Sequence, residues 1–137
     1  MRLWLATGNA GKLEDFAAMG SQWEVGLLPG FTALPTVAET GATCAANARI
    51  KAEHYSRFTP DFVVADDSGL EVEALGGAPG VHSARFAGRH GDDSANNRML
   101  LEKLRGVPRG RRRAAFVCVL AVARMGETLR IFEGRCE

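Results

Sequence analysis

Apolar and polar residues alternate along the first half of the chain in blocks that predict strands and helices in turn. Three short apolar runs predict buried strands, at residues 3–6, 23–28 and 62–65. Two intervening segments with helical spacing predict helices, at residues 12–19 and 40–57. The second of these is rich in alanine and places three small residues on one face, namely Ala45, Ala48 and Ala52. Thr59 and Pro60 predict its end.

The second half of the chain predicts one more helix and a closing hairpin. A strand is expected at 70–74, and residues 76–91 form a long loop rich in glycine and proline. Helical spacing predicts a helix over 92–104, with Ser94 as its cap and inward side chains at Met99, Leu100 and Leu104. Two runs around Met125-Gly126-Glu127 predict a hairpin, at 115–124 and 128–133. The whole pattern predicts an α/β fold with a mixed, twisted sheet flanked by helices.

Composition narrows the class of protein. A chain of 137 residues is long enough for a single domain with a core. Its net charge of +1 argues against a nucleic-acid-binding protein, and the basic run 109–113 is expected to be a solvated connection. No targeting segment is evident, and the longest apolar run, 114–123, is too short to cross a bilayer. Three widely spaced cysteines favour a reducing, cytoplasmic environment, namely Cys44, Cys118 and Cys136.

The turn between the first predicted strand and helix is a candidate phosphate site. It has the sequence Thr7-Gly8-Asn9-Ala10-Gly11-Lys12. Small residues let backbone N–H groups approach an anion, and the start of a helix adds positive potential. Thr7 and Asn9 carry side-chain donors, and Lys12 adds a charge. The glycine spacing is not that of a P-loop, so an ordinary glycine-containing turn is equally consistent.

Two adjacent carboxylates follow an apolar strand in the segment Asp66-Asp67-Ser68-Gly69. Carboxylates beside a buried strand are costly unless they are paired or bind a metal, and ligands commonly lie at strand ends in α/β sheets. Glu39, before the long helix, is expected to complete a site for Mg²⁺ with this pair, because Mg²⁺ prefers oxygen ligands. The alternative is a turn with both acids in solvent.

Two further segments are open to functional and structural interpretations. Asn47 and Lys51 share a helix face, because they lie one turn apart. Arg85 and Phe86, in the glycine-rich loop, suit contact with a base or a phosphate. Caps, solvated surface residues and an ordinary surface loop explain the same residues.

Taken in order, these motifs resemble the inosine/xanthosine triphosphate pyrophosphatase family. The matching segments span the chain through the hairpin: Thr7-Gly8-Asn9-x-x-Lys12, Glu39-Thr40-Gly41-x-Thr43, Asn47-Ala48-x-x-Lys51, Asp66-Asp67-Ser68-Gly69-Leu70, Gly76-Gly77-Ala78-Pro79-Gly80 and Ser83-Ala84-Arg85. The resemblance implies an elongated, two-lobed fold with a central cleft, usually in a homodimer. It implies hydrolysis of ITP, dITP or XTP to the monophosphate and pyrophosphate with Mg²⁺.

The resemblance also assigns residues to roles. It implies that Asp67 is the general base, that Glu39 and Asp67 hold the metal, and that the substrate is contacted at Thr7, Gly8, Asn9, Lys12, Lys51 and Ser68. The partner is a small molecule, with no nucleic acid and no membrane.

Family members carry two later segments, one like Phe-Gly-Tyr-Asp-Pro and one like Ser-His-Arg, and this chain contains neither. We therefore expect residues 1–137 to form one pyrophosphatase domain without the family's C-terminal segment. Three alternatives stay open: a pyrophosphatase for pyrimidine nucleotides, an inactive nucleotide-binding or dimerisation module, and a nucleic-acid binder using the basic run at 109–113.

Overall fold

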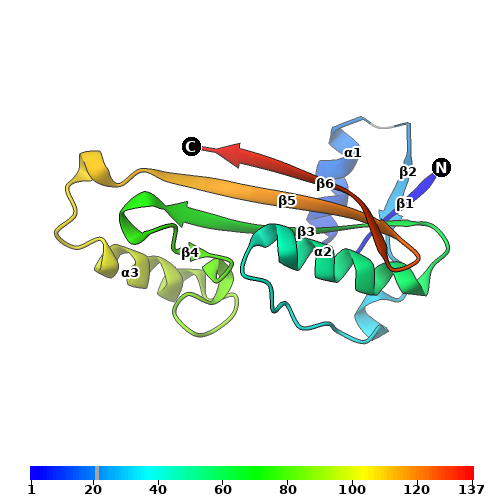
Figure 1. Ribbon diagram of the computed structural model, residues 1–137, viewed down its shortest axis with the longest axis horizontal. Coiled ribbons are helices and arrows are strands. Elements are labelled where there is room, and N and C mark those ends of the chain that lie inside the picture. Colours follow the sequence, from blue (N-terminus) through cyan, green and yellow to red (C-terminus); the bar gives the residue numbers. More distant parts are fainter. Residues whose placement is uncertain (21) are drawn as a thin grey trace.

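The fold is one mixed sheet with helices on both faces, as shown by a computed structural model that describes residues 1–20 and 22–137 (Figure 1). The described strands are β1 (Arg2–Leu5), β2 (Glu24–Leu27), β3 (Phe62–Val72), β4 (Pro79–Gly80), β5 (Ala114–Arg124) and β6 (Glu127–Cys136). The described α-helices are α1 (Ala10–Ala18), α2 (Cys44–Tyr55) and α3 (Asp93–Lys103).

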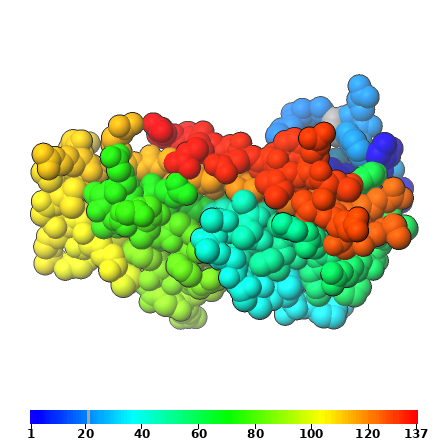
Figure 2. Space-filling view, in the orientation of Figure 1, coloured from blue at the N-terminus to red at the C-terminus, as the bar shows by residue number. Residues whose placement is uncertain are grey.

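The sheet has the order β2-β1-β3-β5-β6, and β4 pairs with β3. β1 runs parallel to β2 and β3, whereas β3, β5 and β6 are antiparallel. α1 lies on one side of the sheet, and α2 and α3 lie on the other (Figure 1). The molecule is elongated, with α3 at one end and β1, β2 and α1 at the other (Figure 2). The predicted mixed sheet flanked by helices is confirmed.

The core lies between α2 and the centre of the sheet. Ala48 and Ala52 are completely buried, and their small side chains let the helix approach the strands closely. The opposing strand residues are small or β-branched and equally buried, at Val63, Ala65, Val119, Ala121 and Ala123. α2 is 12 residues long, and no helix in the described part of the chain has the length and apolar character needed to cross a bilayer.

The largest difference from the sequence prediction concerns β3. The expected strands at 62–65 and 70–74 are one continuous strand of 11 residues, so Asp66-Asp67-Ser68-Gly69 is not a turn. The reason is the partner strand: β5 pairs with β3 without interruption from Val63 to Val72. Hydrogen bonding along a long antiparallel partner overrides the weak strand propensity of Asp and Gly.

Helix starts differ from prediction because caps determine them. α1 begins two residues early, because the Asn9 side chain accepts a hydrogen bond from Gly11 N. α2 begins at Cys44, because Thr43 is its cap and accepts from Ala46 N at 3.1 Å. Asp92, rather than Ser94, caps α3.

The predicted inward face of α3 is only partly correct. Leu104 is buried, whereas Met99 is 38% exposed.

The predicted hairpin between β5 and β6 is present. Met125 and Gly126 both have positive φ, at 52° and 86°, as the tight two-residue turns of hairpins require. Arg112, in the basic run, donates to the carbonyl oxygens of Leu104 and Val107, so this residue has a structural role after α3.

Candidate active site

One edge of β3 is open over a short stretch in the middle of the sheet. β1 pairs with β3 only as far as Val64, and β4 pairs with it only from Leu70. Between these points, residues 65–69 have no strand partner on that edge among the described residues. A ligand that approaches this edge can reach side chains on both faces of β3.

Asp66 and Asp67 point to opposite faces of β3, because successive side chains of a strand alternate. The carboxylate of Asp66 forms an ion pair with Lys12 of α1. Asp66, Lys12 and Thr7 line one small cavity on this face. Asp67 lies on the other face, toward α2, and pairs with Lys51. The structure therefore separates two carboxylates that are adjacent in the sequence.

The turn after β1 leaves its backbone accessible beside Asp66. Thr7 Oγ1 accepts a hydrogen bond from Asn9 N at 3.1 Å, and Asn9 Oδ1 accepts from Gly11 N at 2.9 Å. These bonds fix the turn at the positive end of α1. A methyl group added at Gly8 would meet only the Phe31 ring, at 3.9 Å. The turn thus has space for an anion at the positive end of α1, while the N–H groups of Asn9, Gly11 and Lys12 donate within the turn itself.

On the α2 face, Lys51 lies between two carboxylates. Its Nζ is 3.0 Å from Glu39 Oε1 and 3.8 Å from Asp67 Oδ1. The second oxygen of Asp67, Oδ2, is buried and has no hydrogen-bond partner. A buried carboxylate oxygen without a partner is costly and calls for a cation or a polar ligand. Glu39 and Asp67 therefore fit a site for a divalent cation.

The environment of Asp67 makes it a suitable base. Burial raises the pKa of this carboxyl above its ordinary value, Lys51 opposes the rise, and the charge of Glu39 adds to it. Hydrogen bonding from the Asn47 side chain also opposes the rise. A raised pKa moves a carboxylate toward the range in which it accepts a proton efficiently near neutral pH.

Asn47 joins the Glu39 loop to α2, a role that the sequence alone did not assign. Its side chain is 2% exposed, and its Oδ1 accepts from Gly41 N at 2.7 Å. Gly41 is required there, because an added Cβ would lie 2.6 Å from both Ala46 Cβ and Asn47 Oδ1. The one-turn spacing of Asn47 and Lys51 was the available signal, but nothing in the sequence showed that the Asn47 amide would be buried.

The loop after β3 crosses close to the open edge. Ser83 Oγ accepts from Leu70 N at 2.8 Å and donates to the carbonyl oxygen of Gly80 at 2.6 Å. A Cβ at Gly69 would lie 2.2 Å from that same carbonyl oxygen, so glycine is required. Ser68, beside it, is exposed at the edge. Phe86, farther along the same loop, packs under Lys103 of α3. Lys103 Nζ lies 5.9 Å from the centroid of the Phe86 ring.

The predicted meeting of three acids around one cation is wrong in one respect. In the described part of the chain, no three acidic, histidine or cysteine side chains gather closely enough to hold a metal ion. Asp66 is excluded from the Glu39–Asp67 pair by the alternation of side chains along β3, and Lys12 neutralises it on the other face. Glu39, Asp67 and Lys51 do come together.

Comparisons with known proteins identify the family of this chain. The model of the Ham1 family matches residues 3–137. The dITP/XTP pyrophosphatase of Desulforamulus reducens is 49% identical over 142 residues, which cover 100% of this chain and 69% of that protein. The dITP/XTP pyrophosphatase of Geobacillus kaustophilus is 50% identical, over 97% of this chain and 66% of that protein.

Solved structures show the same fold. The Ham1 protein of Staphylococcus aureus aligns with a TM-score of 0.85 at 39% identity, over 98% of this chain and 69% of that one. A nucleoside-triphosphatase, or dITP/XTP pyrophosphatase, from Mycobacterium abscessus aligns with a TM-score of 0.82 at 43% identity, over 98% of this chain and 72% of that one. The chain thus spans about two thirds of the length of these proteins. The resemblance inferred from the motifs is confirmed.

Proposed function

Because the chain belongs to the Ham1 family, we propose that it hydrolyses non-standard purine nucleoside triphosphates such as ITP, dITP and XTP to the monophosphate and pyrophosphate. The names of the similar proteins support the substrate class. The observation that carries the proposal is the buried, partly unpaired carboxylate of Asp67, which faces Lys51 and Glu39 beside the open edge of β3.

The triphosphate is proposed to lie across that edge and to contact both faces of β3. On one face, Lys12, Thr7, Asn9 and the backbone around Gly8 bind the terminal phosphoryl groups. On the other, Lys51 contacts the phosphoryl group nearest the ribose. The exposed Ser68 contacts the substrate at the edge itself. A polyphosphate is long and flexible enough to pass from one face to the other where no neighbouring strand blocks it.

Mg²⁺ is the proposed cofactor, held by Glu39 and Asp67. The fit rests on two carboxylates that already share the Lys51 ammonium and on the unpartnered Oδ2 of Asp67. Hard oxygen ligands of this kind suit Mg²⁺, which usually takes one or two carboxylates together with substrate phosphates. Bound there, the cation would offset the negative charge of the phosphoryl oxygens.

Asp67 is the proposed general base. It accepts a proton from a water molecule whose oxygen attacks the α-phosphorus. The new bond joins that oxygen to phosphorus, and the bond from phosphorus to the bridging oxygen of the β-phosphate breaks. The leaving pyrophosphate takes the bonding electrons, and Lys12 with the N–H groups of the turn stabilises its charge. Most of the rate enhancement is expected from positioning and charge stabilisation.

Two finer features are also proposed. A homodimer is supported by the family resemblance and by large apolar side chains exposed on β5 and β6, at Phe116, Leu129, Ile131 and Phe132. Sedimentation analysis tests the dimer, and a monomer at micromolar concentration would contradict it.

A cytoplasmic location is supported by three free cysteines.

The experiment that tests the function is pyrophosphate release from a panel of triphosphates, with and without Mg²⁺. ITP, dITP and XTP should release pyrophosphate only with the metal, and faster than ATP or dTTP. Preference for dTTP would overturn the proposed substrate class. Binding of ITP in calorimetry without release of pyrophosphate would identify an inactive nucleotide-binding module instead.

A further inference from the structure

Asn47 is a buried amide that contacts both halves of the proposed cation site. Its side chain is 2% exposed, and α2 places it one turn before Lys51 on the same helix face. A buried amide is costly unless its oxygen and its amino group both have hydrogen-bond partners. The partners of Asn47 therefore explain why a polar residue occupies a core position of α2.

The acceptor end of the amide holds the loop that carries Glu39. Asn47 Oδ1 accepts a hydrogen bond from Gly41 N at 2.7 Å, and Gly41 lies two residues after Glu39. The approach is close, because a Cβ added at Gly41 would lie 2.6 Å from Asn47 Oδ1. The Glu39 side chain then reaches Lys51 Nζ at 3.0 Å. The backbone beside Glu39 is thus fixed to α2.

The donor end of the amide faces Asp67 of β3. Because Gly41 N occupies Oδ1, the amino group of Asn47 is the part left to hydrogen-bond with the Asp67 carboxylate. Burial raises the pKa of Asp67, and this hydrogen bond opposes the rise, as expected of a donor to the charged carboxylate. One amide therefore joins the Glu39 loop to the carboxylate of Asp67.

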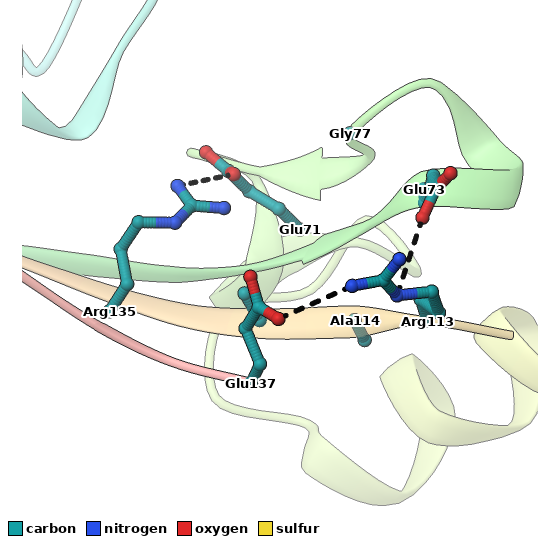
Figure 3. Close-up of a pocket in the computed structure, with 8 residues that line it drawn as sticks. Glu71, Glu73, Gly77, Arg113, Ala114, Arg135 and Glu137 are labelled. Carbon is teal, nitrogen blue, oxygen red and sulfur yellow. Dashed lines mark hydrogen bonds and ion pairs between the residues drawn. The ribbon is translucent and has the colours of Figure 1, made fainter.

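The next carboxylate on this face of β3 is held differently. Glu71 follows Asp67 by four residues and accepts a hydrogen bond from Arg135 Nη1 at 2.9 Å in a charged hollow between β3 and β6 (Figure 3). The Glu71 side chain is 41% exposed, against 16% for Asp67. Water screens an exposed pair of this kind, and it restricts its side chains little. The buried amide constrains Asp67 more tightly than Arg135 constrains Glu71.

We infer that Asn47 is a positioning residue that fixes the Glu39 and Asp67 carboxylates relative to one another, so that both can hold one divalent cation; this inference rests on the proposed function. Groups that hydrogen-bond to metal ligands set their orientation, and loss of such a group typically costs 10–100-fold in metal affinity or activity. Asn47 acts through Asp67 and through the backbone at Gly41. A purely structural amide would contribute to stability and leave kcat unchanged.

Two substitutions separate the two ends of the amide. Asn47→Ala removes both contacts, whereas Asn47→Asp keeps an oxygen acceptor for Gly41 N and loses the donor toward Asp67. Ser56→Ala is the matched control, because Ser56 is fully buried on α2's C-terminal side and its Oγ accepts from Gly126 N at 2.9 Å. The rate constant kcat for ITP at saturating Mg²⁺ should fall roughly 10–100-fold in both Asn47 variants and stay close to wild type in the control. KM for ITP should change less than kcat.

Hydrogen exchange at the Gly41 amide gives a readout that does not depend on activity. This amide should exchange faster in Asn47→Ala than in wild type, because its acceptor is lost. It should stay protected in Asn47→Asp, which keeps the acceptor. Unchanged exchange in Asn47→Ala would show that the amide does not hold the loop and would overturn the inference.

The kinetic outcomes separate this inference from the proposed function. Wild-type kcat in a folded Asn47→Ala or Asn47→Asp protein would overturn the inference and leave the proposed function intact. A fall of kcat in Ser56→Ala as large as in the Asn47 variants would also overturn it, because the loss would then follow from any buried polar substitution.

If the wild-type protein releases no pyrophosphate from ITP, the proposed function fails, and titration with Mn²⁺ alone tests the inference by itself. Binding that is about tenfold weaker in Asn47→Ala than in wild type, and unchanged in Ser56→Ala, supports it. Equal affinity of wild type and Asn47→Ala for Mn²⁺, or no binding by wild type, overturns it.

Discussion

Asp66 and Asp67 lie on opposite faces of β3, and different groups surround each carboxylate. Asp66 is neutralised by Lys12 next to the turn at the start of α1, where a methyl group at Gly8 would meet only the Phe31 ring. Asp67 is 16% exposed, shares Lys51 with Glu39, and keeps one oxygen without a partner. The Asp66 side chain is also 16% exposed, so incomplete pairing, rather than burial or the presence of a carboxylate, distinguishes the position proposed for proton transfer.

The largest effect that tests this comparison is expected from Asp67→Asn. Loss of the general base should lower kcat for ITP by roughly 10²–10⁴-fold, because a well-placed base contributes about that much. Asp66→Asn should retain most of kcat and mainly raise KM, because it disturbs the pairing of Lys12. Steady-state pyrophosphate release with far-UV circular dichroism as a folding control measures both. A folded Asp67→Asn protein with near-normal kcat would exclude Asp67 as the base.

A pair of glycine substitutions separates folding from ligand binding at the open edge. Gly69→Ala should destabilise the protein by about 1–3 kcal/mol, because the new methyl group overlaps the Gly80 carbonyl oxygen. Gly8→Ala should change stability by no more than about 0.5 kcal/mol, since only the Phe31 ring lies near. It should nevertheless raise KM for ITP, because the methyl group occupies the space assigned to phosphate. Urea denaturation and KM measurements distinguish the two sites, and an unchanged KM in Gly8→Ala would argue against a phosphate turn.

The pH dependence of stability should distinguish Asp67 from its neutral replacement. The folded pKa of Asp67 is raised, so the native state binds its proton more tightly than the unfolded state. Stability should therefore fall as pH rises from the ordinary Asp pKa through the raised one. Asp67→Asn should lack this component, and its melting temperature should exceed that of wild type above this window. Thermal melts in a metal chelator across acidic pH measure it. A melting temperature of Asp67→Asn that falls with pH as much as wild type would contradict the assignment.

The smallest expected effect is a change in the alkylation rates of two cysteines, which report on the two faces of β3. Burial and then Asp67 raise the pKa of Cys44, whereas burial and then Asp66 raise that of Cys118. Asp67→Asn should increase alkylation by iodoacetamide a few-fold at Cys44, and Asp66→Asn should do so at Cys118, because the thiolate is the reacting form. Mass spectrometry of each peptide measures the rates. Equal changes at both cysteines in either variant would show that the two faces are not electrostatically distinct.

Much of this architecture follows from local sequence signals. The periodic pattern predicted the helices and the hairpin, and the family resemblance predicted that Glu39 and Asp67 belong to one site. Lys51, which the family motif predicted as a substrate contact, lies 3.0 Å from Glu39, and its contact with substrate stays a prediction.

The rest depends on partners that are distant in sequence. Nothing local shows that β5 pairs with the whole of β3, yet that pairing extends the strand through Asp66 and Asp67 and turns their side chains to opposite faces. A single sequence carries little signal for contacts of this kind.

The central claim is that one triphosphate contacts cations on both faces of β3. Calorimetric titration of a non-hydrolysable ITP analogue into wild type, Lys12→Gln and Lys51→Gln tests it most directly, with Lys103→Gln on α3 as control. Each of the first two variants should bind roughly 10–100-fold more weakly, because a charge-assisted contact contributes about 1.5–3 kcal/mol. The control should bind as wild type does. Unchanged affinity in a folded Lys12→Gln or Lys51→Gln protein would show that the ligand contacts only one face and would contradict the claim.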